Sequence, residues 1–217
     1  MSLVLASTSP RRRHLLALGG WAFRVAPAEV DEQPFPDEDA QTYVIRLALN
    51  KARKAALQLQ GDEIVIAADT AVVDGGQILG KPRDKQEAER VLRRLRGRLH
   101  LVYTGVAVLR VSDGAQVTDC CKTDVPMRFY SDEEMLAYIA TGDPLDKAGA
   151  YAIQHPHFKP VVGLQGCYAN VVGLPLCHLT RALDKLGVQP QTNLPQACQA
   201  ELDYDCPVFL SILSGQG

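Results

Sequence analysis

The amino-acid sequence predicts an α/β protein in which buried strands and amphipathic helices alternate. Residues 64–66 are three consecutive β-branched side chains inside the apolar stretch 63–73, a pattern typical of a strand buried on both faces. Near the N-terminus, the apolar run 3–6 leads through a short polar loop into a helical pattern. Further along, two strand patterns meet at the turn signal 112–114, which indicates a β-hairpin.

Length and composition limit the classes of function. A chain of 217 residues forms one large α/β domain or two small ones, and its 47% hydrophobic and 22% charged residues are ordinary for a globular protein. The net charge of −2 excludes the broad basic surface that nucleic acids or acidic membranes require. No apolar run reaches the ~20 residues of a membrane span, and the N-terminus lacks the basic region of a signal peptide. We therefore expect neither a nucleic-acid nor a membrane partner.

The first helix is expected to begin at an anion-binding site. Ser9 is a natural N-cap and Pro10 suits the first helical turn, so free backbone N–H groups point outward after the first strand. Three consecutive arginines, Arg11, Arg12 and Arg13, are unfavourable at the positive end of a helix dipole. This local conflict indicates that they serve a negative ligand, although helix geometry turns at least one of them, Arg13, elsewhere.

An acidic loop follows the second expected strand, 23–28. Asp31 and Glu32 carry carboxylates of the kind that bind Mg²⁺, which takes oxygen ligands and keeps several waters. A solvated acidic loop without a metal explains the same residues. The sequence leaves both interpretations open.

Two lysines are candidates for holding an anion. A helix is expected over 39–59, with Lys51 and Lys54 in its second half, and one of them could reach a ligand while most helix lysines are solvated. Lys81 precedes Pro82, which holds the backbone extended.

Asp69 and Thr70 interrupt the apolar strand 63–73. A carboxylate in a buried strand is costly unless it is partnered. Asp69 is therefore either a structural residue that holds a turn or bulge, or an acid placed at the edge of the core to meet a substrate or a metal.

Turn and capping signals predict the remaining elements. A hairpin turn over 74–77 leads to a return strand over 78–82. Two helices are expected to begin at capping boxes, Asp84 with Glu87 and Ser131 with Glu134. Strands are expected over 99–111 and 116–129, at the end of 145–154 and within 161–172, and a last helix over 175–186.

Histidines and cysteines give no strong metal signal. His155 and His157 are two residues apart without a third ligand nearby. The six cysteines form no Cys-x-x-Cys pair, which excludes a zinc ribbon or a thioredoxin motif and fits thiols in a reducing cytosol. Cys198 and Cys206 lie in a polar tail, where pairing or oxidation is conceivable.

The candidate residues together suit a polyphosphate ester bound with a divalent metal. Cations would meet the phosphates, and carboxylates would hold the metal and activate water. A simple anion-binding module would not need the carboxylates.

Five sequence blocks resemble one known family. They are Ser7-Thr-Ser-Pro-Arg-Arg12, Ala68-Asp-Thr70, Gly80-Lys-Pro82, Asp146-Lys-Ala-Gly-Ala-Tyr151 with Ile153-Gln154, and Val172-Gly-Leu-Pro175. In this order they are similar to the signature blocks of the Maf-like nucleoside triphosphate pyrophosphatases. The resemblance implies an α/β fold with a mixed twisted sheet, flanking helices and a central nucleotide-binding cleft. It also implies hydrolysis of a nucleoside triphosphate to the monophosphate and pyrophosphate with a divalent cation, Mg²⁺ or Mn²⁺, in the cytoplasm, and it allows a homodimer.

The resemblance also implies roles for individual residues. Asp69 would accept the proton of the attacking water. Base selection would fall to Arg11, Thr70 and Gln154, phosphate binding to Ser9, Arg12, Lys51 and Lys81, and metal binding to Asp31 or Glu32. The combination of Arg-Arg, Asp-Thr and Tyr-x-Ile-Gln is similar to the branch that cleaves dTTP and UTP. The family domain would span 1–187, with an extension of unknown role over 188–217.

Two departures keep alternatives open. The family has Gly after the glutamine where this chain has His155-Pro156-His157, next to the base-selection position, and the tail is longer than usual. Broad-range cleavage, cleavage of purine or 7-methyl-GTP nucleotides, and a nucleotide-binding regulatory role in cell division are the alternatives.

Overall fold

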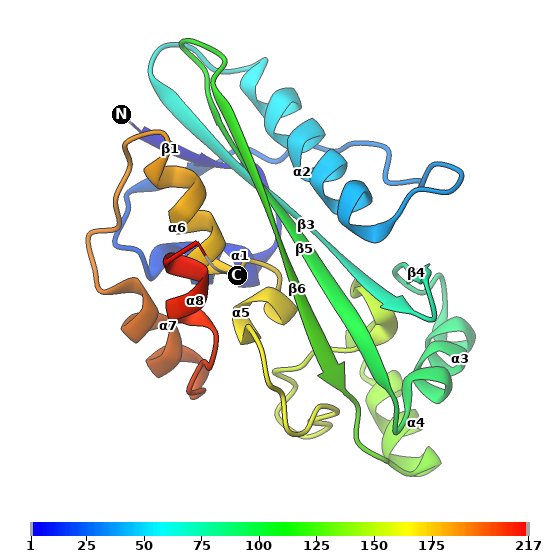
Figure 1. Cartoon of the computed structure of the whole chain (residues 1–217). Helices are drawn as coiled ribbons and strands as arrows, with labels where there is room; N and C mark the ends of the chain where they lie inside the picture. The colour runs from blue at the N-terminus through cyan, green and yellow to red at the C-terminus, as the bar shows by residue number, and fades with distance from the viewer. Residues whose placement is uncertain (1, 216–217) are drawn as a thin grey trace.

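The long apolar strand predicted around Asp69 is the centre of a mixed sheet. The structure is a computed structural model that describes residues 2–215. Its strands are β1 (Ser2–Leu5), β2 (Phe23–Val25), β3 (Glu63–Asp74), β4 (Gln77–Leu79), β5 (Leu99–Arg110) and β6 (Gln116–Pro126). The order is β2-β1-β3-β5-β6, with β4 paired to β3 beside this path. β1 runs parallel to β2 and β3, whereas β3, β5 and β6 form an antiparallel meander (Figure 1).

Helices cover both faces of this sheet. The α-helices are α1 (Pro10–Ala17), α2 (Ala40–Ala56), α3 (Lys85–Leu95), α4 (Asp132–Ala140), α5 (Tyr168–Val172), α6 (Leu176–Asp184), α7 (Leu194–Leu202) and α8 (Phe209–Leu213). Two short 3₁₀ helices, η1 (Asp143–Asp146) and η2 (Ala148–Ala150), lie between α4 and α5. α2 lies alone across one face, and α5 and α6 pack against the other (Figure 1).

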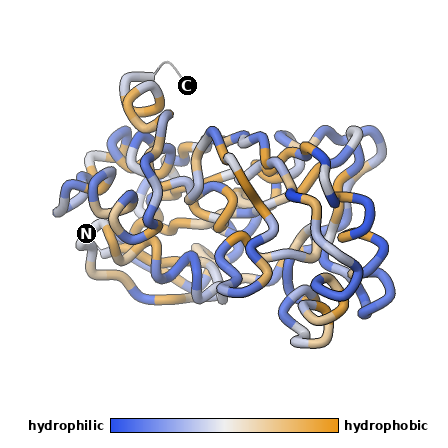
Figure 2. The backbone as a smooth tube through the Cα atoms, turned by 90° about the horizontal axis from the view of Figure 1, so that it is seen from below, coloured by the Kyte–Doolittle hydropathy of each residue, from blue (hydrophilic) through white to orange (hydrophobic). Residues whose placement is uncertain are grey.

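Alternating side chains of the strands divide the core into two layers. Ile64 and Ile66 of β3 point to the layer shared with α1 and α6, whereas Val65 and Ala67 point to the layer shared with α2. This alternation is the two-residue period of a strand with both faces buried. Hydrophobic segments accordingly run through the middle of the molecule, with hydrophilic segments in the outer loops (Figure 2). The mixed α/β fold is confirmed.

Most helix starts follow the predicted capping signals. Ser9 caps α1, Asp39 caps α2, and Ser131 forms the complete capping box with Glu134. The second capping box is only half formed: Asp84 accepts the N–H of Glu87, but the Glu87 carboxylate accepts the backbone N–H of Arg83 instead of that of Asp84.

The strand predictions after residue 77 were partly wrong. β4 ends at Leu79, so Gly80–Pro82 lie in a loop, and residues 151–154 form a turn rather than a strand. Residues 161–172 contain one isolated bridge, between Met127 and Val161, followed by helix α5. Glycines at 149, 163, 166 and 173 bend this part of the chain, and three of them have positive φ, which a strand does not tolerate.

The C-terminal extension is folded and packs on the body. Leu194 and Leu202 of α7 are buried in the same core layer as α1 and α6. At the start of the extension, the carbonyl of Gln189 accepts the indole N–H of Trp21 at 2.8 Å, and the N–H of Gln191 donates to the carbonyl of Gly19 at 2.8 Å. All six cysteines are free, so Cys198 and Cys206 are not paired with each other. None of the helices between residues 2 and 215 has the length and apolar character that would let it cross a bilayer.

We expect two buried histidines to make the protein less stable at mildly acidic pH. Burial lowers the pKa of His100 and of His178 to about 4. Between this value and the ordinary pKa of ~6.5, the unfolded chain binds protons that the native state does not, so stability falls as pH falls. We expect each residue to lower the free energy of unfolding by about 2 kcal/mol between pH 7 and pH 5, measured by denaturant titration. His178→Gln should remove about half of the total loss that the two histidines cause together. The exposed His157→Gln should leave the loss unchanged, and an equal loss in both variants would contradict the assignment.

Candidate active site

The cleft lies beside the second half of β3, from Asp69 to Val72. It has a volume of about 720 Å³ and is lined by the 6–12 segment, the 27–32 loop, α2, β3, the loop around Lys81, and residues 146–154 and 171–173. This volume lies within the range of ~300–1,000 Å³ of ordinary ligand pockets. Asp69 and Thr70 are neighbours on β3, so their side chains point to opposite faces of the sheet and approach the cleft from two sides.

Lys51 joins two carboxylates on the α2 side of the cleft. Its Nζ lies 2.5 Å from Asp69 Oδ1 and 2.6 Å from Glu32 Oε1. The Asp69 side chain is only 9% exposed. Burial raises the pKa of Asp69, against the opposing effects of Lys51 and Arg12. The carboxylate thus has a more basic character than an exposed aspartate while a neighbouring ammonium holds it in place.

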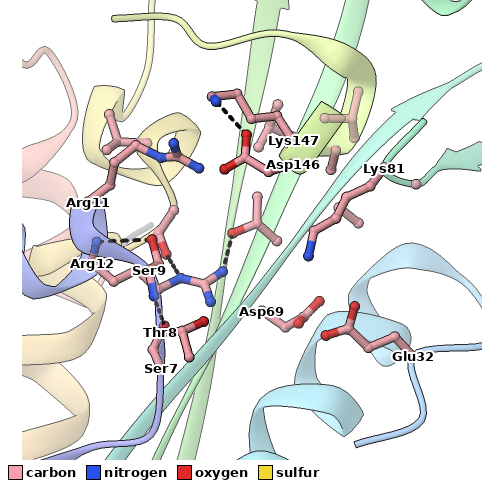
Figure 3. A pocket seen from close by; sticks show the side chains of 18 of the residues that line it. Ser7, Thr8, Ser9, Arg11, Arg12, Glu32, Asp69, Lys81, Asp146 and Lys147 are labelled. Atoms are coloured by element: carbon pink, nitrogen blue, oxygen red, sulfur yellow. Dashed lines mark hydrogen bonds and ion pairs between the residues drawn. The ribbon is translucent and has the colours of Figure 1, made fainter. Parts of the chain in front are cut away.

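Glu32 faces Asp69 from the loop between β2 and α2 (Figure 3). Its backbone carbonyl accepts the hydroxyl of the buried Tyr43 at 2.8 Å, which ties the loop to α2. Partial burial acts to raise the pKa of Glu32. The hydrogen bond and charge of Lys51, together with the charges of Lys81 and Arg12, outweigh burial and hold the pKa below its usual value. Glu32 is therefore ionised at neutral pH.

Asp31 does not face the cleft. It accepts the backbone N–H of Gln33 at 3.0 Å and lines a separate groove on the other side of the same loop, with Arg46 and Lys54. Successive residues of an extended loop point in opposite directions, so only one of the two predicted acids reaches Asp69. Of Asp31 and Glu32, only Glu32 lies beside Asp69.

Arg12 is held on the opposite side of the cleft by two hydrogen bonds. Its Nε donates to the carbonyl of Gly173 at 2.8 Å, and its Nη2 donates to Thr70 Oγ1 at 3.0 Å. Burial lowers the pKa of Arg12, with Asp69 acting against this effect. A guanidinium has five N–H donors, so three remain for a ligand in the cleft. Arg12 is thus a fixed cation aimed at the space in front of Asp69 (Figure 3).

The other predicted residues also line the cleft. Ser9 accepts the N–H of Arg12 at 3.4 Å, so its hydroxyl caps the helix, and Arg13 is exposed away from the cleft, as predicted. Arg11 and Lys81 lie around the rim, and within residues 2–215 neither makes an ion pair shorter than 4.0 Å. Gln154 is exposed at the far end of the cleft. All of the predicted site residues except Asp31 line this one cleft.

Comparison with known proteins identifies the family. A sequence model of the Maf family, described as "Maf-like protein", matches residues 2–186. The chain belongs to the Maf family. It is 47% identical over 186 residues to the dTTP/UTP pyrophosphatase of Citrifermentans bemidjiense, covering 86% of this chain and 96% of that protein. It is also 47% identical over 214 residues to the dTTP/UTP pyrophosphatase of Thermomicrobium roseum, covering 96% of this chain and 94% of that protein. Among solved structures, a HAM1 protein from Coxiella burnetii aligns with a TM-score of 0.46 at 16% identity, covering 86% of this chain and 96% of that chain.

Two glycines in this Maf protein let the chain pack closely around the site. Gly173 has φ +117°, and a Cβ there would lie 3.4 Å from both Arg12 Nε and Thr70 Oγ1. Gly149 has φ +70°, donates its N–H to the carbonyl of Gly80 at 3.2 Å, and packs against Val72 of β3. The blocks Val172–Pro175 and Asp146–Tyr151 therefore anchor Arg12 and the Lys81 loop. The sequence signal for this anchoring role is a glycine among apolar residues in each block, and the sequence analysis did not assign the role from it.

Polar residues around Lys147 form the wall next to Gln154. The buried Lys147 Nζ contacts Asp143 Oδ1 at 2.8 Å and Asp146 Oδ1 at 2.6 Å, so its charge is neutralised (Figure 3). His155 Nδ1 accepts the backbone N–H of Phe158 at 2.9 Å. The unusual His155–His157 segment thus closes a turn behind Gln154. In residues 2–215, no group of three or more His, Cys, Asp or Glu side chains is arranged to hold a metal ion.

Proposed function

We propose that this Maf protein hydrolyses a nucleoside triphosphate, dTTP or UTP, to the monophosphate and pyrophosphate. The observation that carries the proposal is the buried Asp69 carboxylate, paired with Lys51 and facing Glu32, in a cleft rimmed by cations. The names of the relatives from Citrifermentans bemidjiense and Thermomicrobium roseum support the same activity. A site that only bound anions would gain nothing from two carboxylates that repel a triphosphate.

Asp69 is the residue suited to activating water. General bases work best when their pKa lies near the working pH, and burial raises the pKa of Asp69 in that direction. In the proposed reaction, Asp69 takes a proton from a water molecule as the water oxygen attacks phosphorus. The bond from that phosphorus to the bridging oxygen breaks, and pyrophosphate leaves with the electron pair. Lys51 keeps the carboxylate ionised and oriented until the proton is transferred.

Arg12 and Lys81 would neutralise the charge of the triphosphate. Arg12 is pre-oriented by Gly173 and Thr70, so no conformational entropy is lost at that side chain on binding. Lys81 is exposed at the rim, where it can meet the outer phosphates. The two cations together favour the extended triphosphate over the monophosphate product.

The carboxylates of Glu32 and Asp69 fit a divalent cation, which we propose as Mg²⁺ or Mn²⁺. Both accept a hydrogen bond from Lys51 Nζ, so the two carboxylates lie close together at the wall of the cleft. Two protein carboxylates completed by substrate oxygens and water are the usual environment of Mg²⁺. When bound, the cation supplies positive charge to the phosphate oxygens at the site of cleavage.

Gln154 and Arg11 are the proposed partners of the base, together with Thr70. The amide of Gln154 can donate and accept, which matches the alternating edge of uracil or thymine. A pyrophosphate-release assay over a panel of triphosphates tests the function. We expect kcat/KM for dTTP and UTP to exceed that for ATP and GTP by about 10²-fold, because a mismatched base covers these polar groups and leaves them unpaired. Equal rates for GTP and UTP would refute the base assignment, and no release from any triphosphate would refute the function.

Asp69→Asn tests the general base. The amide keeps the shape of the side chain but cannot accept the proton, and loss of a general base typically costs about 10²–10⁴-fold in rate. In the wild type, kcat/KM should fall with decreasing pH at a value above the ~4 of an ordinary aspartate, because the base works only when deprotonated. A folded Asp69→Asn protein that keeps more than about a tenth of the rate would show Asp69 to be structural.

Glu32→Gln and Asp31→Asn form a matched pair that tests the metal site. The two carboxylates are adjacent in sequence, but only Glu32 faces Asp69. We expect Glu32→Gln to raise the Mg²⁺ concentration for half-maximal activity by about 10-fold or more, and Asp31→Asn to change it little. The same ions should bind the wild type in calorimetry without substrate, and more weakly after Glu32→Gln. Equal effects of the two changes would argue against Glu32 as the metal ligand.

A further inference from the structure

Side chains of α2 hold the loop that carries Glu32. Residues 29–38 of this loop form neither a strand nor a helix. Three of its backbone carbonyls accept hydrogen bonds from α2, and the donors and acceptors are Lys54 to Glu29, Tyr43 to Glu32 at 2.8 Å, and Arg46 to Gln33 at 3.1 Å. The path of the loop beside the cleft is therefore set by the helix.

Arg46 contacts this loop on three sides. Its Nε and Nη2 each lie 2.6 Å from a different carboxylate oxygen of Glu38. Its Nη2 also donates to the carbonyl of Gln33, and its Cζ lies 3.9 Å from the centre of the Phe35 ring. Glu38 in turn accepts the backbone N–H of Phe35 at 3.0 Å. One guanidinium thus connects three points of the loop, and we call these four residues the Arg46 clamp.

The Glu38 carboxylate depends on Arg46 for its charge compensation. The Glu38 side chain is only 4% exposed, although it belongs to a loop. A buried carboxylate without a counter-ion is strongly destabilising, so the loss of Arg46 would drive Glu38 into water. α2 is packed on the sheet through Val44 and Leu47, which are completely buried. The loop, rather than the helix, would therefore move.

The clamp lies next to the loop residue that matters for the site. Asp31 precedes Glu32 and Gln33 follows it. Glu32 lines the cleft (Figure 3), whereas Asp31 lines the outer groove with Arg46. A rotation of this backbone segment would exchange the two carboxylates between these positions. By fixing the carbonyl of Gln33, Arg46 opposes that rotation and keeps Glu32 on the cleft side.

We propose that Arg46 is a positioning residue that keeps Glu32 beside Asp69 and thereby supports the divalent-cation site. The inference rests on the proposed function for the role of Glu32 as a metal ligand. It assigns a part in that site to a residue outside the cleft, since Arg46 lies in the groove on the other side of the loop. Partners that orient a metal ligand typically contribute about 10–100-fold to metal affinity.

Four variants separate this role from a general structural one. Arg46→Gln removes the charge and the forked contact, whereas Arg46→Lys keeps the charge but cannot bond Gln33 and both oxygens of Glu38 in one plane. Glu38→Gln weakens the clamp from the loop side, so the test does not depend on a single variant being folded. Arg53→Gln is the matched control, because Arg53 lies in the same helix and groove but its Nη2 donates to Gln116 Oε1 of β6 at 3.1 Å. Thermal unfolding identifies any variant that fails to fold.

The first measurement is Mg²⁺ binding by calorimetry without nucleotide, together with the Mg²⁺ concentration for half-maximal cleavage of UTP. We expect Arg46→Gln and Arg46→Lys to weaken both by about 10-fold, and Glu38→Gln to act in the same direction. Arg53→Gln should keep the wild-type values. Adding Arg46→Gln to Glu32→Gln should weaken binding no further, because Arg46 acts through Glu32. Adding it to Asp31→Asn should give the full loss.

The second measurement is hydrogen exchange at the Phe35 N–H, which needs neither metal nor nucleotide. This N–H donates to the Glu38 carboxylate inside the clamp. We expect it to exchange about 10-fold faster in Arg46→Gln and at the wild-type rate in Arg53→Gln. Unchanged exchange in Arg46→Gln would show that Arg46 does not hold the loop, and would overturn the inference.

The outcomes distinguish the inference from the proposed function. A protein whose Mg²⁺ binding falls in Glu32→Gln and in Arg46→Gln, but which cleaves no triphosphate, would refute the proposed function and leave the role of Arg46 standing. Unchanged Mg²⁺ affinity in folded Arg46→Gln would overturn the inference while cleavage of UTP stands.

Two further results would also overturn the inference. Wild-type Mg²⁺ affinity in Arg46→Lys would show an effect of charge alone. An additional loss from Arg46→Gln in the Glu32→Gln background would show an effect that bypasses Glu32. A wild-type protein that binds no Mg²⁺ in either measurement would overturn the inference together with the metal site.

Discussion

The ion pair between Lys51 and Asp69 is the interaction on which the site depends. A carboxylate that is 9% exposed in the central strand would be strongly destabilising alone, because burial penalises its charged form. Lys51 compensates this charge at 2.5 Å and binds Glu32 at the same time. Burial raises the pKa of Asp69, while Lys51 and Arg12 act against this rise and favour the charged form.

The position of Lys51 follows from how closely α2 approaches the sheet. A Cβ on Gly105 of β5 would lie 2.6 Å from the backbone of Val44, so glycine lets the helix rest directly on the strand. Val44 and Leu47 are completely buried in this contact, while Lys51 lies one turn beyond Leu47 and reaches Asp69. The position of Lys51 is therefore a consequence of helix packing directly beside Asp69, because Gly105 is the residue opposite Asp69 in the sheet register.

Local signals in the sequence predicted much of the fold and most of the site. Ser9 caps the helix that presents Arg12, because a hydroxyl followed by proline favours a helix start in any context. The β-branched run 64–66 lies in the central strand. Where glycines dominate, as in 161–173, the side chains carry no period, and the strand predictions failed because tertiary contacts determine that path. Asp31 and Glu32 could not be separated from sequence, since only the twist of the loop decides which carboxylate faces the cleft.

The sequence by itself determined the α/β class, the helix starts, the cations at 11, 12 and 81, and the acidic character of Asp69, because these depend on local propensity and residue chemistry. It also carried the five blocks that resemble the Maf family. The tertiary structure alone decided the partnership of Lys51 with Asp69 and the position of Glu32, rather than Asp31, beside them. Each of these depends on the orientation of groups from segments separated by 18 or more positions, as Lys51 is from Asp69 and from Glu32. The partner of a buried carboxylate depends on its neighbours in space, so the residues around Asp69 in the sequence could not indicate Lys51 as its partner.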